Sequence, residues 1–293
     1  MPILEALQTY PLLWLGTALV LGLCVGSFLN VVIWRLPRMM EQSWRQECMQ
    51  LLEEAAVTTA PAPEFNLATP ASHCPHCQAA IRPWQNIPLV SYLVLGGKCH
   101  HCKTPISARY PIIEAVAGAL AVLVAVHWGV SWQALAMMGF AWALLALTMI
   151  DVDHQLLPDQ ITLPLVWAGL IANQFGLFTT LSGAVWGAVA GYLTLWSVYH
   201  LFKLVTGKEG MGYGDFKLLA ALGAWLGWQA LPLIIILSSL VGAVVGVVQL
   251  SLQGRDRSTP IPFGPYLAAA GLIAALWGEF LINAYFQFAG LGR

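Results

Sequence analysis

Two long stretches without a charged residue constrain this chain more than any other feature. One lies between Asp159 and Lys203 and the other between Lys217 and Arg255, and neither contains Asp, Glu, Lys or Arg. A helix crosses a bilayer with about 20 apolar residues, so each stretch has room for two crossings. Charged residues are 9% of the 293 positions, whereas a soluble domain has roughly 25%. The composition argues against a single water-soluble globule.

Apolar runs separated by Gly, Pro or polar residues predict eight membrane-spanning helices. Their approximate ranges are 12–33, 112–129, 133–150, 161–177, 182–203, 216–229, 232–251 and 264–285. The fold class that follows is an all-α polytopic membrane protein. The first helix follows a start that has Glu5 but no Lys or Arg, and it lacks a small-residue cleavage site. We therefore expect it to remain in the mature protein as an anchor.

The positions of Lys and Arg predict the orientation, because short loops retained in the cytoplasm collect these residues. With eight crossings and the N-terminus outside, nearly all of the 13 Lys and Arg fall on one side: Arg35, Arg38, Arg45, Arg82, Lys98, Lys103, Arg109, Lys203, Lys208, Lys217, Arg255 and Arg257. Only Arg293 falls outside this set. We expect a multi-pass membrane protein whose chemistry faces the cytoplasm.

The polar residues divide the chain into three parts. Residues 1–34 form the first membrane helix, 35–110 a cytoplasmic subdomain with the Pro-rich stretch Thr58 to Pro63, and 111–293 the remaining membrane domain. Glycines four residues apart favour close helix packing; they are Gly22/Gly26, Gly183/Gly187/Gly191 and Gly242/Gly246.

Two CxxC pairs in the cytoplasmic subdomain predict a metal site. Cys74 and Cys77 are separated from Cys99 and Cys102 by 21 residues, close to the spacing of four-thiolate zinc ribbons. Four sulfurs fill a tetrahedral site, so the zinc would be structural. Two disulfides are the alternative, but stable disulfides are rare in a reducing cytoplasm. We expect solvent-facing histidines beside the thiols (His73, His76, His100, His101), and ordinary thiols at Cys24 and Cys48.

Few acidic residues occur in the hydrophobic part of the chain: Glu114, Asp151, Asp153, Asp159, Asp215 and Glu279. Carboxylates near hydrocarbon are costly and usually functional. Asp151 ends the third predicted helix, and Asp215 begins the sixth after a glycine-rich run. Two carboxylates about 3 Å apart hold one proton between them, so one acts as base and the other as acid in peptide hydrolysis by water.

Other interpretations of these acids remain open. Asp215 alone fits a helix N-cap, where Asp is favoured. Asp151 and Asp153 point roughly 200° apart if one helix includes both, so only one of them serves the pair. The residues alone do not choose between them. A transporter with intramembrane carboxylates and a noncatalytic scaffold are the rival functions, although a transporter is expected to place its acids near the bilayer midplane.

The run Gly212-Tyr213-Gly214-Asp215 resembles the GxGD motif of membrane aspartic proteases, and residues 150–159 resemble its partner segment. The match is to the type IV prepilin peptidases. It extends to Gly26–Pro37, the double CxxC, Arg109-Tyr110-Pro111 with Glu114, and Pro260–Pro265. The resemblance implies that Asp151 and Asp215 are the catalytic pair and that Asp153 and Asp159 support them.

The resemblance also implies substrates and a second activity. The expected substrates are membrane-inserted precursors of type IV pilins and of the pseudopilins of type II secretion, with a basic leader that is cleaved after a Gly and followed by an apolar helix. The second activity is methylation of the new N-terminus by S-adenosylmethionine, with Gly96, Gly97, Arg109 and Glu114 as candidate residues. Gly96 and Gly97 are equally consistent with a turn, and Glu114 is equally consistent with an ion pair to Arg109. Membrane lipid is an expected partner, and nucleic acid is not.

Overall fold

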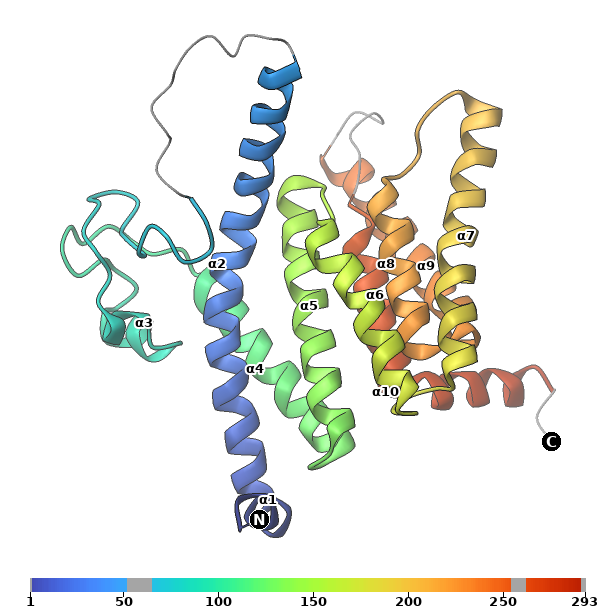
Figure 1. Cartoon of the computed structure of the whole chain (residues 1–293), viewed down its shortest axis with the longest axis horizontal. Helices are drawn as coiled ribbons and strands as arrows, with labels where there is room; N and C mark the ends of the chain where they lie inside the picture. Colours follow the sequence, from blue (N-terminus) through green and yellow to red (C-terminus); the bar gives the residue numbers. More distant parts are fainter. Residues whose placement is uncertain (1, 52–64, 254–261, 291–293) are drawn as a thin grey trace. The chain divides into compact units, whose positions relative to one another are not determined.

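The computed structural model describes residues 2–51, 65–253 and 262–290, and this part of the chain is helical without a β-sheet (Figure 1). The predicted all-α class is confirmed. The chain divides into two compact units, Met1–Ala134 and Leu135–Arg293, which are described separately. The Pro-rich stretch Thr58 to Pro63 and the cations Arg255, Arg257 and Arg293 lie outside the described residues.

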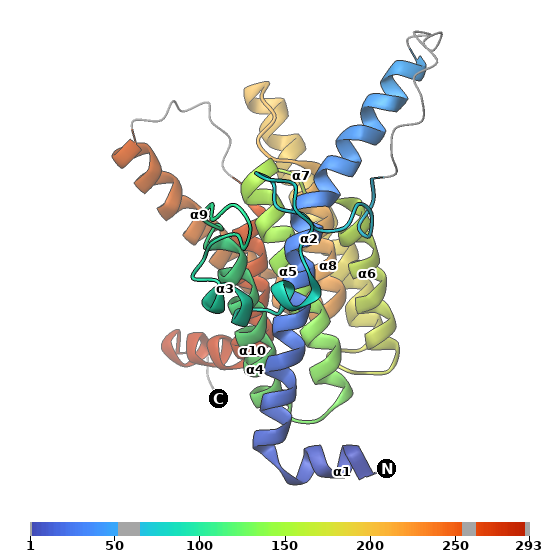
Figure 2. The same cartoon turned by 90° about the vertical axis from the view of Figure 1, so that its left-hand side faces the viewer.

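The first unit is built on two long helices with a loop-rich insertion between them (Figure 2). Its elements are α1 (Pro2–Thr9), α2 (Pro11–Leu51), η1 (Pro83–Asn86), α3 (Val90–Val94) and α4 (Arg109–Trp128). Helices α2 and α4 pack together because glycines remove the side chains between them. A Cβ on Gly22 would lie 2.7 Å from the Ala117 carbonyl oxygen, and one on Gly26 would lie 2.7 Å from the Glu114 Cα. The predicted packing role of this glycine pair is confirmed.

Helix α2 is longer than the sequence predicts. We expected a helix end near Ile33, but α2 continues through Pro37 to Leu51. An interior proline removes one backbone hydrogen bond and commonly breaks a helix. The Arg38 guanidinium donates a 2.7 Å hydrogen bond to the Trp34 carbonyl and lies 3.9 Å over the Trp34 ring, so its side chain lies along the helix beside Pro37. The polar insertion therefore begins as helix, and the boundary between parts at residue 34 stays a prediction.

The second unit is a helical bundle. Its elements are the part of α5 (Trp132–His154) from Leu135 onward, α6 (Asp159–Gln174), α7 (Leu181–Thr206), α8 (Tyr213–Leu226), η2 (Trp228–Ala230), α9 (Leu231–Gln253) and α10 (Gly264–Phe288). Helix α8 forms the core of this unit: it packs against α6, α7 and α10, and Phe216, Leu219 and Leu222 are fully buried. A Cβ on Gly191 would lie 2.5 Å from the Leu219 carbonyl oxygen, so α7 approaches α8 closely only through glycine.

Six helical spans of the described residues are long and apolar enough to cross a membrane. They are Pro11–Met49, Arg109–Trp128, Trp132–His154, Leu181–Thr206, Trp228–Val248 and Gly264–Phe288. The other two predicted crossings, 161–177 and 216–229, correspond to α6 and α8, which have 16 and 14 residues. The count of eight crossings stays a prediction.

Candidate active site and metal centre

Asp151 lies in the last turn of α5 and is 5% exposed. Its Oδ2 accepts a 2.9 Å hydrogen bond from the backbone N–H of Gly264, the first residue of α10. A Cβ on Gly264 would lie 2.7 Å from this oxygen, so a larger residue would push the two groups apart. The N-terminal end of a helix also favours negative charge. The start of α10 therefore holds the Asp151 carboxylate in one orientation.

Asp215 lies in the first turn of α8 and is 7% exposed. The N-cap interpretation is wrong, because Gly212 is the N-cap and Asp215 lies three residues after it, inside the first turn. The Asp215 backbone N–H donates to the Gly212 carbonyl at 3.2 Å. The Asp215 side chain is therefore buried within the first turn of α8 rather than placed at its N-cap.

The two carboxylates belong to one site within the second unit. Asp151 is close enough to Asp215 for their charges to interact directly. Buried Leu157 joins the surrounding segments: a Cβ on Gly214 would lie 2.7 Å from its Cβ, and a Cβ on Gly264 would lie 3.1 Å from its Cδ2. Three segments far apart in sequence, 151–157, 212–215 and 263–264, therefore converge on the pair.

Asp151 and Asp153 occupy different surroundings on the same helix. Helix α5 continues through both residues to His154, so their side chains point roughly 200° apart around the helix axis. Asp151 is buried beside Asp215, whereas Asp153 is exposed. Of the two aspartates, the structure thus brings Asp151 to the site beside Asp215.

Asp159 takes part in an ion pair beside the site. The Lys217 ammonium lies 2.7 Å from both carboxylate oxygens of Asp159, and it follows Asp215 by two residues. The pair joins the first turn of α6 to that of α8. The ion pair therefore holds the first turn of α8 in place, and the Asp159 carboxylate is bonded to Lys217.

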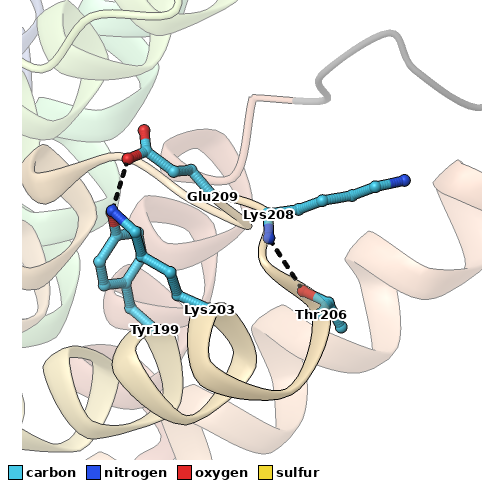
Figure 3. Close-up of polar contacts among 5 residues, drawn as sticks. All are labelled: Tyr199, Lys203, Thr206, Lys208 and Glu209. Carbon is cyan, nitrogen blue, oxygen red and sulfur yellow. Dashed lines mark hydrogen bonds and ion pairs between the residues drawn. The ribbon is translucent and has the colours of Figure 1, made fainter.

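The loop between α7 and α8 is tied back to α7 (Figure 3). The Lys203 ammonium lies 2.8 Å from the Glu209 carboxylate and 3.5 Å from the Tyr199 hydroxyl. This hydrogen bond from Lys203 lowers the pKa of Glu209. The buried Tyr199 ring packs against the rings of Tyr213 and Phe216, at centroid distances of 5.4 and 5.6 Å. The glycine-rich run before Asp215 is therefore anchored at both ends.

Sequence reasoning gave no role to Gly264 or Leu157. Gly264 belongs to the run Pro260–Pro265, of which residues 262 onward are described. A glycine immediately before a proline and an apolar helix was the available signal. The bond from Gly264 to Asp151 spans 113 positions, so only the fold shows it.

The four cysteines form one cluster in the first unit. The Sγ atoms of Cys74, Cys77, Cys99 and Cys102 all lie within 4.8 Å of one another. Tetrahedral zinc with Zn–S bonds of about 2.3 Å places its sulfurs about 3.8 Å apart. The Cys74 and Cys102 sulfurs are 3.8 Å apart, and none of the four forms a disulfide. The residues fit structural zinc.

The two CxxC turns, residues 74–79 and 99–104, have the same backbone structure and are called knuckles below. Cys74 N–H donates to the Ala79 carbonyl at 2.9 Å, and Cys99 N–H donates to the Thr104 carbonyl at 2.8 Å. Gln78 and Lys103, at equivalent positions, both have a φ of +59°. Hydrogen bonds from the Cys77 and His76 backbone lower the pKa of the Cys74 thiol, which favours a thiolate ligand. Each knuckle is pre-shaped to present two sulfurs.

The candidate methyl-donor residues lie in the first unit. Gly96 and Gly97 have φ angles of +61° and +67° in the turn between α3 and the second knuckle, as the turn interpretation expects. Glu114 is buried in α4, and its Oε2 accepts a 2.8 Å hydrogen bond from the Leu89 N–H. Arg109 is the half-buried first residue of α4. Their role in binding a methyl donor stays a prediction.

Comparison with known proteins finds two family models along the chain. Residues 20–128 match the bacterial peptidase A24 N-terminal domain, and residues 138–247 match the type IV leader peptidase family. No solved structure matches.

Full-length relatives are similar to this chain throughout. A protein of Stutzerimonas stutzeri named "Prepilin leader peptidase/N-methyltransferase" is 61% identical over 98% of this chain and 99% of its own length. Proteins with the same name are 58% identical in Pseudomonas aeruginosa, over 99% of each chain, and 52% identical in Aeromonas hydrophila, over 97% of each chain. Both family models, the convergent aspartates and this full-length identity agree: the chain belongs to the type IV leader peptidase family.

Proposed function

We propose that this chain is an aspartic endopeptidase that removes leader peptides from type IV prepilins, with Asp151 and Asp215 as the catalytic pair. The observation that carries the proposal is the burial of both carboxylates at one place, with Asp151 held by the Gly264 N–H. The names of the full-length relatives support the reaction. Buried carboxylates are expensive in a membrane protein and usually functional.

The pair performs hydrolysis by sharing one proton. The ionised carboxylate takes a proton from water while the water oxygen attacks the carbonyl carbon of the scissile peptide bond. The protonated carboxyl donates a hydrogen bond to the carbonyl oxygen, where negative charge develops. When the tetrahedral intermediate collapses, the C–N bond breaks and the leaving nitrogen receives the proton that the base took from water, so the pair again holds one proton.

Other groups at the site act by positioning. The Gly264 N–H fixes the rotamer of Asp151, and Leu157 packs between the two glycines on either side of the pair. The Asp159–Lys217 pair keeps the first turns of α6 and α8 together. Asp153, exposed on the same helix as Asp151, has no direct part in this chemistry.

The chain is a multi-pass membrane protein, since six apolar spans accompany its family membership. The bacterial inner membrane and a cytoplasmic active site are our assignments, supported by the distribution of Lys and Arg. We assign pseudopilin precursors to the same site as prepilins, because both substrates place an apolar helix beside a charged leader.

The four clustered cysteines would hold zinc. Bound zinc would cross-link the two knuckles. Because four thiolates fill its coordination shell, it would offer no open position for a reaction. This chain's own contribution is the pair of backbone turns that preset the sulfur positions.

We further propose that the chain methylates the new N-terminus, with S-adenosylmethionine as methyl donor. The relatives' shared name includes N-methyltransferase, which supports this activity. Gly96, Gly97, Arg109 and Glu114 remain the candidate residues, all in the first unit. The family and relatives give no support to the transporter alternative.

The test is incubation of the purified, full-length protein with a prepilin and labelled S-adenosylmethionine. We expect the wild type to shorten the prepilin and transfer label to it, and Asp215→Asn to do neither while retaining its zinc. Added mature pilin, already cleaved, should still accept label from Asp215→Asn. Undiminished cleavage by Asp215→Asn contradicts the catalytic pair, and absence of label in every reaction contradicts the methylation.

A further inference from the structure

The cysteine insertion of the first unit exposes large apolar side chains shortly before its second knuckle. They lie in η1, in α3 and between them: Trp84, Ile87, Val90, Leu93 and Val94. Leu93 and Val94 are 76% and 73% exposed. We call residues 84–94 the apolar segment. Exposed apolar patches on a protein surface mark a partner or a membrane.

A hydrogen bond joins the apolar segment to a membrane span. The Leu89 N–H donates to Glu114 Oε2 at 2.8 Å. Glu114 follows by five residues Arg109, where the span Arg109–Trp128 begins, so this bond lies about 7.5 Å along the span. In Figures 1 and 2, α3 is level with the first half of α4. Helices that lie in a membrane interface are buried about 5–10 Å into the boundary between headgroups and acyl chains, which is the depth found here.

The surroundings at this depth are apolar. Helix α4 exposes Ile112 and Val116, the residues two positions before and after Glu114. A membrane span exposes such side chains to lipid. Lipid is therefore the nearest apolar medium to the exposed side chains of the apolar segment as well.

The backbone of the apolar segment is suited to a region with little water, where an unpaired N–H is costly. Pro88 has no N–H, and the Leu89 N–H is bonded to Glu114. Six further N–H groups donate to carbonyls of residues 87–93 at 2.6–3.1 Å; they belong to Val90, Ser91, Leu93, Leu95, Gly96 and Gly97. These internal bonds allow a short, irregular segment to enter the interface.

Exposed cations flank the apolar segment in the sequence. Arg82 precedes it and Lys98 follows it. Such side chains keep their charge beside lipid phosphates while their stems cover apolar surface. The Trp84 ring, of a type favoured at membrane interfaces, lies 5.8 Å from the His100 ring of the second knuckle. The apolar segment is thus in contact with the second knuckle as well as with α4.

We infer that the apolar segment lies in the membrane interface, with its exposed side chains among lipid acyl chains, and that it holds the cysteine cluster against the membrane surface. Residues 35–110 then form a membrane-bound insertion rather than a freely solvated subdomain. The inference goes beyond the proposed peptidase and methyltransferase activities and depends on neither. The competing occupants are a second copy of this chain and a protein that docks from solution.

Ala68 provides a matched control at another depth. It is exposed in the same insertion, in a loop whose backbone carbonyls accept hydrogen bonds from Arg35. Helices α2 and α4 are antiparallel, and Asn30 of α2 donates to the Tyr110 carbonyl at the start of α4. Arg35 follows Asn30 by five residues, so this loop lies about 7.5 Å beyond the start of the span, whereas the apolar segment lies inside it.

The test uses the purified, full-length protein in vesicles of phosphatidylcholine and phosphatidylglycerol, with a fluorescent amino acid at position 93 or 68. Bromine on the lipid acyl chains should quench the fluorescence at position 93 and leave position 68 bright. Acrylamide dissolved in the water should do the reverse. A protein labelled at position 93 whose thermal unfolding differs from that of the wild type is replaced by one labelled at Val94.

Two outcomes contradict the inference. If acrylamide quenches position 93 as strongly as position 68, the apolar segment faces water and is open to a protein from solution. If neither quencher reaches position 93, another protein surface covers the segment, as expected for a second copy of this chain.

A second test adds a charge to the apolar segment. With the fluorescent amino acid at Val94, Leu93→Asp should reduce quenching by the brominated lipid, because a carboxylate is costly among acyl chains. Ala68→Asp with the same label is the control and should leave the quenching unchanged. Equal quenching in the two folded variants overturns the inference.

Discussion

The cysteine cluster and the carboxylate pair are built in opposite ways. The cluster joins two turns that are 21 residues apart and have the same hydrogen bonds and the same positive φ at Gln78 and Lys103, so local sequence defines the shape of each turn. The carboxylate pair depends on segments around residues 151, 215 and 264, which meet only after the helices pack. A local site tolerates changes elsewhere, whereas a site made by packing depends on close contacts that no short motif encodes.

The largest effect should come from breaking the local site. Cys74→Ser removes one of four thiolates, and we expect bound zinc to fall from about one per chain to near zero, since structural zinc contributes about 10–16 kcal/mol in small zinc-binding peptides. Elemental analysis measures the zinc, and limited proteolysis should show new cleavage between residues 72 and 106. Cys24→Ser, an exposed cysteine outside the cluster, is the control.

If the wild type contains no metal and Cys74, Cys77, Cys99 and Cys102 are paired as disulfides, the assignment of the cysteine cluster as a zinc site is wrong. Retention of full zinc by Cys74→Ser has the same consequence.

The next effect concerns the packed site. Gly264→Ala brings a methyl group to 2.7 Å from Asp151 Oδ2 and forces the carboxylate to move. Displacement of a catalytic group by about 1 Å costs roughly 100-fold in rate. We therefore expect kcat for prepilin cleavage to fall by about this factor, with zinc content unchanged.

Gly278→Ala, in the same helix α10, is the matched control because no neighbouring atom lies closer than 3.9 Å to the added Cβ. If both alanine variants cleave prepilin at the wild-type rate, the close approach of Gly264 has no catalytic importance.

The smallest effect should come from the loop anchor. Glu209→Gln removes the ion pair with Lys203, and exposed pairs contribute little, so kcat/KM should fall by less than about threefold. The ion pair with Lys203 lowers the pKa of Glu209 in the folded protein. The stability that the pair contributes is therefore fully present at pH values above the ordinary pKa of a Glu carboxyl, and it is lost as the pH falls through the lowered pKa. The difference between wild type and variant should shrink in acid, measured as kcat/KM against pH. A large effect that persists at low pH assigns Glu209 another role.

The sequence predicted what depends on composition and local spacing. The helical class and the cysteine cluster are confirmed, and seven of the eight predicted helical ranges agree with the structure to within a few residues; the membrane crossing of α6 and α8 stays a prediction. The predicted end of the first helix near Ile33 was wrong, because α2 continues through Pro37 to Leu51. Short-range rules treat that proline as a stop.

The carboxylate site was only partly predictable. Spacing within a helix separated Asp151 from Asp153 by direction but did not say which direction faces Asp215. That answer needs the loop residue Leu157 to pack against Gly214 of α8 and Gly264 of α10, and the Gly264 N–H that bonds to Asp151 lies 113 positions away. The N-cap interpretation of Asp215 was wrong because the helix begins at Tyr213, two residues earlier.

The most direct test of the account compares two aspartates two residues apart on one helix. Asp151→Asn and Asp153→Asn are purified from the same membrane, shown to be folded by thermal unfolding transitions equal to that of the wild type, and assayed for kcat on a prepilin. General acid–base groups contribute about 10²–10⁴-fold, so we expect Asp151→Asn to lose at least about 100-fold and Asp153→Asn to stay within about threefold of wild type. Loss of cleavage in Asp153→Asn with activity retained in Asp151→Asn would contradict the central claim.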